Sequence, residues 1–367
     1  MKKALIFVNS DIVIYNFKKE LLLALIEKGF EVYVSVPFGE KIELLKEIGV
    51  KLIETKIDRR GINPFSDLKL YAQYDKIIKQ IKPEFIMTLT VKCNIYGGKA
   101  ARKHKIPYYC NVTGLGTAFQ KNNWLKKIVV RLYKSALKGV NKVFFENESN
   151  LQVFLSEKII PEDKACLLKG AGVNLDEFKF EPMPERDFVS FLYLGRIMKE
   201  KGIDELLFAA EKIHAEFPFF KIKLVGYCEE NYSDKLDEAQ KKGFAEYCGF
   251  QNCVKDFIKD ADCVVLPSYH EGMSNTLLES ASMGRPLITS DIPGCREAVE
   301  DGQNGFLCKA KSGESLYDAM KRFMLLSGEE RQRMGIASRG LMEKSFDRKS
   351  VVNTTLNFVL SEEEAIK

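Results

Sequence analysis

The stretch FVSFLYLGRIMKEKGIDELLFAA, residues 188–210, decides the fold. Its first seven residues are almost all apolar, aromatic or β-branched, which predicts a buried strand. Gly195 ends that strand, a loop with several cations follows, and Gly202 precedes a run whose apolar residues recur at helical spacing. A buried strand joined by a short loop to a helix is the repeating unit of a parallel sheet with helices on both faces.

The same alternation of strands and helices runs through both halves of the chain. Short apolar runs predict further strands at 4–9, 31–36, 51–57, 85–90, 107–112 and 142–147, and at 220–226, 263–268, 285–291 and 305–308. Between the two series, EPMPERD (181–187) contains two prolines and mixed charge, which is typical of a linker. We therefore predict an α/β protein with two doubly wound domains, residues 1–182 and 187–345, that bind ligands at the carboxyl ends of strands.

Length and composition exclude several classes of protein. The chain has 367 residues, which is long for one hydrophobic core, and 46% hydrophobic with 29% charged residues is typical of a globular protein. Its apolar runs are shorter than the roughly 20 residues of a transmembrane helix, and the N-terminal run ALIFV is too short for a signal peptide. Nine cysteines without a CxxC pair fit a reducing cytoplasm, and three scattered histidines suggest no zinc site.

Charge is distributed unevenly along the chain. Residues 1–180 contain 31 Lys and Arg against 19 Asp and Glu, whereas the remainder contains 25 against 32. Between Glu84 and Glu146 there are twelve Lys and Arg and no acidic residue. The first half is therefore expected to face an anionic partner: a membrane surface, a phosphorylated ligand or a nucleic acid. Nucleic acid is the weakest of the three, because the basic residues lack a pattern of aromatic residues for stacking on bases.

The loop LGRIMKEKG (194–202) is the first candidate for chemistry. Arg196 and Lys201 lie at a strand end and close to a helix N-terminus, a combination suited to a diphosphate. The guanidinium can contact two phosphate oxygens, while the ammonium acts as a point charge. The alternative is an ordinary loop with solvated cations. The dinucleotide fingerprint GxGxxG and the Walker A sequence are both absent.

The stretch HEGMSNTLLE (270–279) is the second candidate, because it carries two carboxylates, Glu271 and Glu279. Ser274 or Asn275 is expected to cap a helix, which places Glu271 in the loop after a strand and Glu279 in the first turns of the helix. A glycosidase-type acid/base pair requires carboxyl groups about 5–9.5 Å apart, which this placement does not guarantee. The other interpretations are two contacts to one ligand, or two ordinary surface acids.

Three motifs of the second half together resemble the retaining glycosyltransferases of family 4: GR-x4-KG at 195–202, E-x7-E at 271–279 and PGCREAVEDGQNGFL at 293–307. The resemblance covers essentially the whole chain. It implies the GT-B fold, in which two Rossmann-like domains face a central cleft, with a last helix, about 348–365, returning to the first domain. In the first half, IYNFKKEL, RRGINPF and TVKCNIYGGKAARKHKIPYYCNVTGLGTAF (90–119) are similar to enzymes that extend polyprenyl-diphosphate-linked sugars for capsule, O-antigen or bacterial protein glycosylation.

The resemblance assigns the donor site to the second domain. It implies that Arg196 and Lys201 contact the diphosphate of a UDP-sugar, that Glu271 contacts the transferred sugar, and that Glu279 bonds the ribose. Arg196, Lys201 and Glu271 are the expected catalytic residues. The remaining expected donor contacts are Gly195, Gly272, Met273, Ser274 and Asn275. Because fixed cations stand in for a divalent metal, no metal or other cofactor is expected, and the leaving phosphate can take the acceptor's proton.

The acceptor is expected to bind the first domain. The candidate contacts are Asn9, Ser10, Arg59, Arg60, Lys92, Thr113 and Gly114, although any one of the cations can equally be a solvated surface charge. Many members of the family have a histidine where this chain has Thr113-Gly114, which disfavours a mechanism based on histidine. The implied activity is transfer of a hexose or N-acetylhexosamine, with retention of configuration, from a UDP-sugar to a polyprenyl-diphosphate-linked sugar. The alternatives are a UDP-sugar 2-epimerase of the same architecture and a transferase with a soluble acceptor.

The segment WLKKIVVRLYKSALKG (124–139) combines apolar residues with five cations. One interpretation is a helix in the membrane interface whose cations contact anionic headgroups. The other is a core helix with a basic outer face. With the uneven charge of the chain, the segment suggests a cytoplasmic enzyme that is peripheral at the inner face of the cell membrane.

Overall fold

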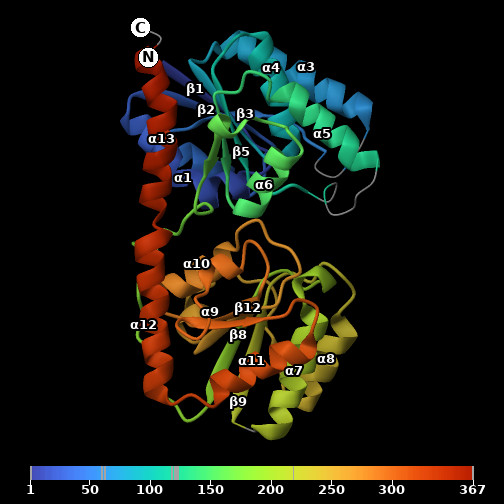
Figure 1. The fold of residues 1–367 in the computed structure, drawn as a ribbon, viewed down its shortest axis with the longest axis vertical. Helices are drawn as coiled ribbons and strands as arrows, with labels where there is room; N and C mark the ends of the chain where they lie inside the picture. Colours follow the sequence, from blue (N-terminus) through green and yellow to red (C-terminus); the bar gives the residue numbers. More distant parts are fainter. Residues whose placement is uncertain are drawn as a thin grey trace. The chain divides into compact units, whose positions relative to one another are not determined.

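The computed structural model describes residues 2–365 except 59, 60, 62, 117, 118, 120–123 and 218. It divides into two compact units: Met1–Ala171 with Arg348–Lys367, and Gly172–Asp347. Each unit is built on a parallel sheet with helices on both faces, as the alternation of strands and helices predicts (Figure 1). We call these units the first and the second domain.

Within the described residues, the first domain has a seven-stranded parallel sheet in the order β3-β2-β1-β4-β5-β6-β7. Its strands are β1 (Lys2–Phe7), β2 (Phe30–Val36), β3 (Lys51–Glu54), β4 (Phe85–Leu89), β5 (Tyr108–Val112), β6 (Lys142–Phe145) and β7 (Ala165–Leu167). Its helices are α1 (Asp11–Glu27), α2 (Ile42–Glu47), α3 (Pro64–Ile81), the π-helix η1 (Cys93–Gly97), α4 (Gly98–Lys103), α5 (Trp124–Ala136), α6 (Glu148–Ser156), the 3-10 turn η3 (Glu162–Lys164) and α13 (Arg348–Ala365).

Alternate residues of the central strand β1 face two different hydrophobic cores, because successive side chains of a strand point to opposite faces. Ala4 and Ile6 belong to the core beneath α1, α2 and α13. Leu5 and Phe7 belong to the core beneath α3, α4, α5 and α6. Burial on both faces explains why β1 reads as a continuous apolar run in the sequence.

The last helix, α13, packs on the first domain beside α1 (Figure 1). Val351 and Val359 enter the core beneath α1. Arg348 is only 4% exposed, and its guanidinium donates to the carbonyl oxygen of Asn16 at 3.0 Å and contacts the Glu20 carboxylate at 3.2 Å. The helix is thus held by apolar burial and by a buried ion pair at its first turn.

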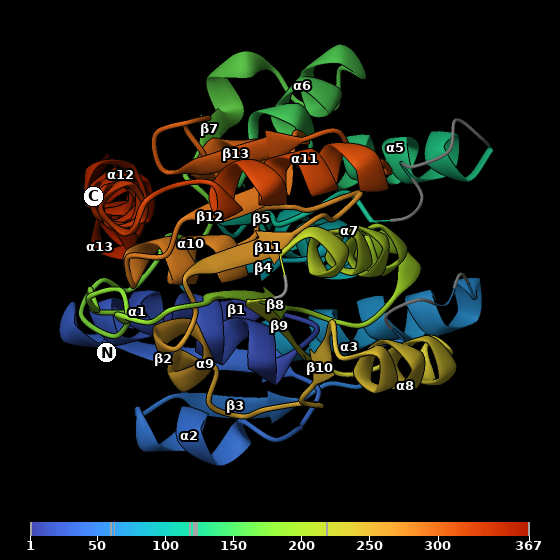
Figure 2. The same ribbon diagram turned by 90° about the horizontal axis from the view of Figure 1, so that it is seen from below.

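Within the described residues, the second domain has a six-stranded parallel sheet in the order β10-β9-β8-β11-β12-β13, which can be followed in Figure 2. Its strands are β8 (Val189–Leu194), β9 (Phe220–Val225), β10 (Glu246–Tyr247), β11 (Cys263–Leu266), β12 (Leu287–Ser290) and β13 (Gly305–Cys308). Its helices are η4 (Lys199–Lys201), α7 (Ile203–Glu216), α8 (Ser233–Lys242), α9 (Lys255–Lys259), α10 (Asn275–Ser282), η5 (Arg296–Ala298), α11 (Gly313–Met324) and α12 (Gly328–Ser345). Helices α7, α8 and α11 lie on one side of the sheet, and α9, α10 and α12 on the other (Figure 2).

The second domain begins before the predicted linker. The Val173 N–H donates to the carbonyl oxygen of Phe346 at 2.8 Å, and Phe178, 7% exposed, lies in the core of the second domain. Residues 173–182, which are predicted from the sequence to end the first domain, therefore pack on the second. The prolines of 181–187 follow a crossing that has already taken place at Ala171–Gly172.

In both sheets the strand order reverses beside the central strand, between β1 and β4 in the first domain and between β8 and β11 in the second. In doubly wound sheets such a reversal opens a crevice at the carboxyl ends of the strands, where ligands bind. No helix within the described ranges is long and apolar enough to cross a membrane. The same residues contain no group of three or more His, Cys, Asp or Glu placed to hold a metal ion.

Candidate functional site

The loop after β8 is packed directly against the loop after β11. Gly202, the N-cap of α7, adopts a φ of +74°, and a Cβ at this position would lie 2.2 Å from the carbonyl oxygen of Pro267. Only glycine combines the left-handed conformation with so close an approach. Lys201, the preceding residue, is therefore held beside the segment that follows β11.

Lys201 and Glu271 form an ion pair between these two loops. The Lys201 Nζ lies 2.5 Å from Glu271 Oε1, and the two side chains are 15% and 14% exposed. The same carboxylate oxygen accepts a hydrogen bond from the Ser268 hydroxyl at 2.8 Å. The structure thus brings together two expected donor-site residues that lie 70 positions apart in the sequence.

Arg196 contacts a carboxylate that the sequence motifs do not predict. Its Nη1 lies 2.5 Å from Oε2 of Glu229, in the segment after β9, and the Arg196 side chain is half exposed. The Arg196 carbonyl accepts from the Tyr193 hydroxyl at 2.7 Å. Burial raises the pKa of the Tyr193 hydroxyl well above its ordinary value, and the nearby Glu271 carboxylate adds a smaller effect in the same direction. The hydroxyl therefore remains neutral and can donate. The backbone at Arg196 is therefore fixed while its guanidinium stays accessible.

The N-terminus of α10 contributes a third part of the site. Ser274 is the cap: its hydroxyl accepts from the Leu277 N–H at 3.4 Å, and its own N–H donates to the carbonyl oxygen of Gly294 at 2.8 Å. Gly294 has a φ of +86°, and a Cβ there would lie 2.5 Å from the carbonyl oxygen of Gly272. The glycine of the PGCREA motif thus lets the β12 loop support the turn that begins α10. Asn275, the first residue of the helix, has a buried side-chain oxygen with no hydrogen-bond partner in the described part of the chain.

The two carboxylates of HEGMSNTLLE occupy different elements, as predicted. Glu271 lies in the loop after β11 and forms an ion pair with Lys201, whereas Glu279 lies within α10 and is partly buried. Helix N-termini and paired cations are suited to binding phosphate. Arg196, Lys201 and the N-terminus of α10 come from the loops that follow the neighbouring strands β8 and β11, so the arrangement can hold a diphosphate.

The acceptor candidates of the first domain lie at one edge of its sheet. Asn9 and Ser10 follow β1, and Lys92 follows β4. Ser10, 6% exposed, caps α1 by accepting from the Val13 N–H at 3.4 Å. The Lys92 Nζ lies 2.8 Å from an Asp67 carboxylate oxygen, with the two side chains 14% and 18% exposed. Ser10 and Lys92 are therefore fixed by partners within the domain and are not solvated surface groups.

For the other acceptor candidates the structure gives a position at most. Thr113 and Gly114 follow β5 at the same edge of the sheet, and both are half-buried. Arg59 and Arg60 lie outside the described residues. Their expected role therefore stays a prediction.

Helix α5 has features of both interpretations of residues 124–139, the core helix and the helix at a membrane surface. Val130 and Tyr133 are buried in the core of the first domain. On the outer face, Trp124 is 65% exposed and Ile128 is 42% exposed. The helix is thus a core helix that also presents apolar side chains outward.

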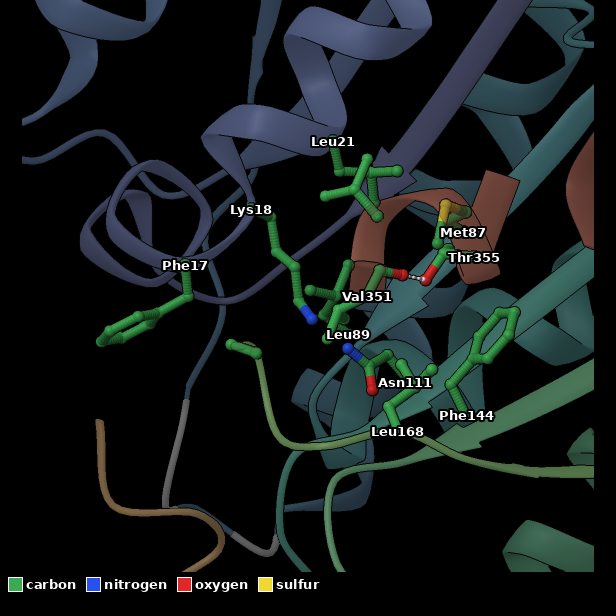
Figure 3. Close-up of a pocket in the computed structure, with 12 residues that line it drawn as sticks. Phe17, Lys18, Leu21, Met87, Leu89, Asn111, Phe144, Leu168, Val351 and Thr355 are labelled. Atoms are coloured by element: carbon green, nitrogen blue, oxygen red, sulfur yellow. Dashed lines mark hydrogen bonds between the residues drawn. The ribbon is translucent and has the colours of Figure 1, made fainter. Parts of the chain in front are cut away.

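A small pocket of the first domain lies between α1, the strands β4 to β6 and α13 (Figure 3). Lys18 Nζ lies 3.3 Å from Glu146 Oε1, with both side chains 8% exposed, and Asn111 Nδ2 lies 3.4 Å from the same oxygen. The free volume is about 20 Å³, which admits about one water molecule and no sugar. We interpret this polar cluster as a tie between α1 and the end of β6.

Comparison with known proteins identifies the family. Residues 3–147 match the family described as glycosyl transferase 4-like, and residues 176–340 match the glycosyl transferases group 1. Over 343 residues the chain is 30% identical to the N,N'-diacetylbacillosaminyl-diphospho-undecaprenol alpha-1,3-N-acetylgalactosaminyltransferase of Campylobacter jejuni, covering 88% of this chain and 89% of that protein. The chain is a group 1 glycosyltransferase. The family expected from the three motifs is confirmed.

Further comparisons extend this result. The glycosyltransferase is 28% identical over 284 residues to the UDP-Gal:alpha-D-GlcNAc-diphosphoundecaprenol alpha-1,3-galactosyltransferase of Escherichia coli, covering 72% of each chain. Its fold is similar to that of a glycosyltransferase from Rickettsia africae, with a TM-score of 0.81 at 19% identity over 97% of both chains. It is also similar to Anabaena HepE in complex with UDP and glucose, with a TM-score of 0.79 at 14% identity over 98% and 100% of the two chains. The predicted fold of two Rossmann-like domains is confirmed.

Proposed function

We propose that this glycosyltransferase moves a hexose or N-acetylhexosamine from a UDP-sugar to a polyprenyl-diphosphate-linked sugar, with retention of configuration and without a metal ion. The observation that supports a UDP-sugar donor is the Lys201–Glu271 pair. It joins the two loops beside the strand-order reversal of the second domain. The names of the Campylobacter and E. coli relatives support the acceptor part, because each describes transfer to a sugar on diphospho-undecaprenol.

Donor binding exchanges the partners of this ion pair. A diphosphate offers Lys201 a second anion in place of Glu271. The carboxylate is then released to accept hydrogen bonds from the sugar hydroxyls. A ligand that carries both a diphosphate and a sugar replaces the partners of both residues, whereas UDP alone leaves Glu271 without a cation. We therefore expect the intact UDP-sugar to stabilise the protein more than UDP does.

Charge develops on the diphosphate during the reaction. As the bond between the anomeric carbon and the phosphate oxygen breaks, that oxygen becomes negative. Arg196, Lys201 and the N-terminus of α10 stabilise it more in the transition state than in the ground state. The acceptor hydroxyl attacks the anomeric carbon on the face that the phosphate leaves, and its proton passes to the departing oxygen. No residue is required as a base, so Glu271 orients the sugar.

A thermal-shift screen of UDP-sugars tests the donor assignment. One UDP-sugar should raise the Tm more than UDP at equal concentration, because a ligand that binds only the folded state stabilises it. The same sugar on GDP is the matched control, and the variant Lys201→Met should lose most of the shift. If no UDP-sugar shifts the Tm, or if the GDP-sugar shifts it equally, the donor assignment is wrong.

The outer face of α5 is the proposed contact with the cytoplasmic face of the membrane. Trp124 and Ile128 are exposed on the same helix as the exposed cations Lys127, Arg131 and Lys134. Apolar side chains flanked by cations favour binding to a surface of anionic lipid. The long segment without acidic residues that contains α5 adds to this attraction.

Liposome sedimentation tests this contact. Vesicles rich in anionic lipid should pellet the protein at low salt, and the double variant Arg131→Glu/Lys134→Glu should remain in solution. The matched control is Lys241→Glu/Lys344→Glu, which changes the net charge equally but on exposed positions of the second domain. Equal pelleting with neutral lipid, or equal loss in both double variants, contradicts a contact through α5.

A further inference from the structure

The backbone at Thr90, the residue that follows β4, is strained. Its φ of +76° lies in the left-handed region, where a β-branched residue is a genuine outlier. The other non-glycine residues with positive φ in the described part of the chain are all lysines: Lys82, Lys105, Lys158 and Lys311. Because glycine adopts this conformation without strain, the turn alone does not explain a threonine here.

Buried contacts on the C-terminal side hold Thr90 in this conformation. The Asn94 N–H donates to the Thr90 carbonyl oxygen at 2.8 Å, and the fully buried Asn94 side chain donates to the carbonyl oxygen of Asn111 on β5 at 3.0 Å. Asn94 belongs to the π-helix η1. Such helices are rare in proteins, and those that occur are often found at functional sites. A Cβ on Gly97 would lie 2.9 Å from the Phe7 ring, so η1 is pressed closely onto β1.

A second set of contacts fixes the same segment to α3. Asp67, in the first turn of α3, accepts from the Lys92 ammonium and from the Tyr96 hydroxyl, both at 2.8 Å. The chain is thus fixed two residues after Thr90 as well as at Asn94. Strain of this kind persists only where the surroundings determine the conformation, and it is concentrated at active sites and ligand contacts.

The Thr90 hydroxyl has no partner that would account for the threonine. Its oxygen is buried and makes no hydrogen bond within the described residues, although the residue as a whole is partly exposed. An unpaired buried hydroxyl costs free energy without contributing to the fold. Because no hydrogen bond holds it, rotation about the Cα–Cβ bond can move the hydroxyl out of this buried position.

We propose that Thr90 is a binding residue for the diphosphate of the acceptor, to which its hydroxyl donates a hydrogen bond. This inference rests on the proposed function and adds a contact that the motifs do not assign. Thr90 follows β4, the strand beside the order reversal of the first sheet, and ligands of doubly wound domains bind at such a reversal. Lys92, two residues further on, is paired with the Asp67 carboxylate at 2.8 Å, and a diphosphate would offer its ammonium a second anion. Along the sequence, no acidic residue occurs between Glu84 and Glu146. An anionic group of the acceptor fits these surroundings better than its neutral sugar.

The variant Thr90→Val tests the proposal, because it keeps the shape of the side chain and removes only the hydroxyl. We expect an unchanged or slightly higher Tm, an unchanged Tm shift with the UDP-sugar, and a kcat/KM for the lipid-linked acceptor lower by about 10- to 100-fold. Thr90→Ser, which keeps the hydroxyl, should retain activity within a few-fold. Inhibition of wild-type transfer by a prenyl diphosphate without sugar should weaken by a similar factor in Thr90→Val.

A matched pair of glycine variants separates strain from function. Thr90→Gly and Lys82→Gly should both raise the Tm by relieving a positive φ, but only Thr90→Gly should lose transfer. If Thr90→Val has the same kcat/KM for the lipid-linked acceptor as the wild-type protein, the inference is wrong. If prenyl diphosphate inhibits Thr90→Val as strongly as it inhibits the wild-type protein, the assignment to the diphosphate is wrong. If the wild-type protein itself transfers nothing to a lipid-linked acceptor, the proposed function fails instead.

Discussion

Removing the positive charge of Lys201 should lower the stability of the protein moderately and the rate of sugar transfer much more strongly. The Lys201–Glu271 pair is 2.5 Å long and its side chains are 15% and 14% exposed. Breaking a fully buried pair costs about 3–5 kcal/mol, because one charge is left uncompensated. Here Glu271 keeps the Ser268 hydroxyl at 2.8 Å and some contact with solvent. We therefore expect Lys201→Met to lower the free energy of unfolding by about 1–3 kcal/mol.

The effect of Lys201→Met on transfer should be larger than its effect on stability. Loss of one preorganised group that stabilises transition-state charge lowers kcat by about 10²- to 10³-fold. The assay is transfer of a radiolabelled sugar from the UDP-sugar to the lipid-linked acceptor, at a temperature where urea unfolding shows both proteins fully folded.

The double variant Lys201→Met/Glu271→Gln completes this test. It removes both charges, so the free energy of unfolding should return to within about 1 kcal/mol of the wild-type value. Transfer should stay low, because both donor contacts are missing. Restored transfer in the double variant, or near-wild-type transfer in Lys201→Met, would refute the role of Lys201 on the diphosphate.

Three further predictions concern packing, the ribose contact and pH. Gly202→Ala should lower the free energy of unfolding by more than about 2 kcal/mol in urea titrations, since it combines a positive φ with a Cβ 2.2 Å from the Pro267 carbonyl oxygen. A loss below about 0.5 kcal/mol contradicts this packing. Glu279→Gln should raise the KM for the UDP-sugar about tenfold with little change in kcat, because it weakens a contact present in ground and transition states alike; a change confined to kcat is the contrary result. The Lys103 ammonium, with two further basic neighbours, holds the pKa of the Asp75 carboxyl well below its usual value. That carboxylate therefore adds stability that is complete above about pH 4 and is lost as the pH falls further. Asp75→Asn should lower the Tm at pH 7, by a difference that narrows below about pH 4, and a difference independent of pH counts against it.

The sequence predicts much of the fold because the strands are buried on both faces. The opening stretch contains β8, its loop and the start of α7 as expected, and the strong apolar runs of β1 and β4 are strands too. The two-residue strand β10 and the three-residue strand β7 escaped prediction, because such short edge strands carry almost no periodic signal. The predicted domain boundary lies about ten residues after the observed one, because the composition of 173–182 does not reveal that Phe178 enters the core of the second domain.

The candidate site was predicted where chemistry and local structure coincide. The cation pattern of 195–202 and the cap at Ser274 are visible in the sequence, so Lys201 and the N-terminus of α10 could be selected. Glu229 could not, because its contact with Arg196 depends on the conformation of the segment after β9. The strain at Thr90 is a property of the backbone, and a threonine that follows an apolar strand gives no sign of it.

The most direct test of the account is a single transfer reaction. The purified protein is incubated in EDTA with the UDP-sugar that gives the largest Tm shift and with a polyprenyl-diphosphate-linked sugar, and the product is analysed by mass spectrometry and NMR. The account predicts a glycolipid longer by one sugar, in which the new linkage keeps the anomeric configuration of the donor. A donor sugar that is isomerised without acceptor, a requirement for divalent metal, or transfer only to a soluble acceptor would contradict it.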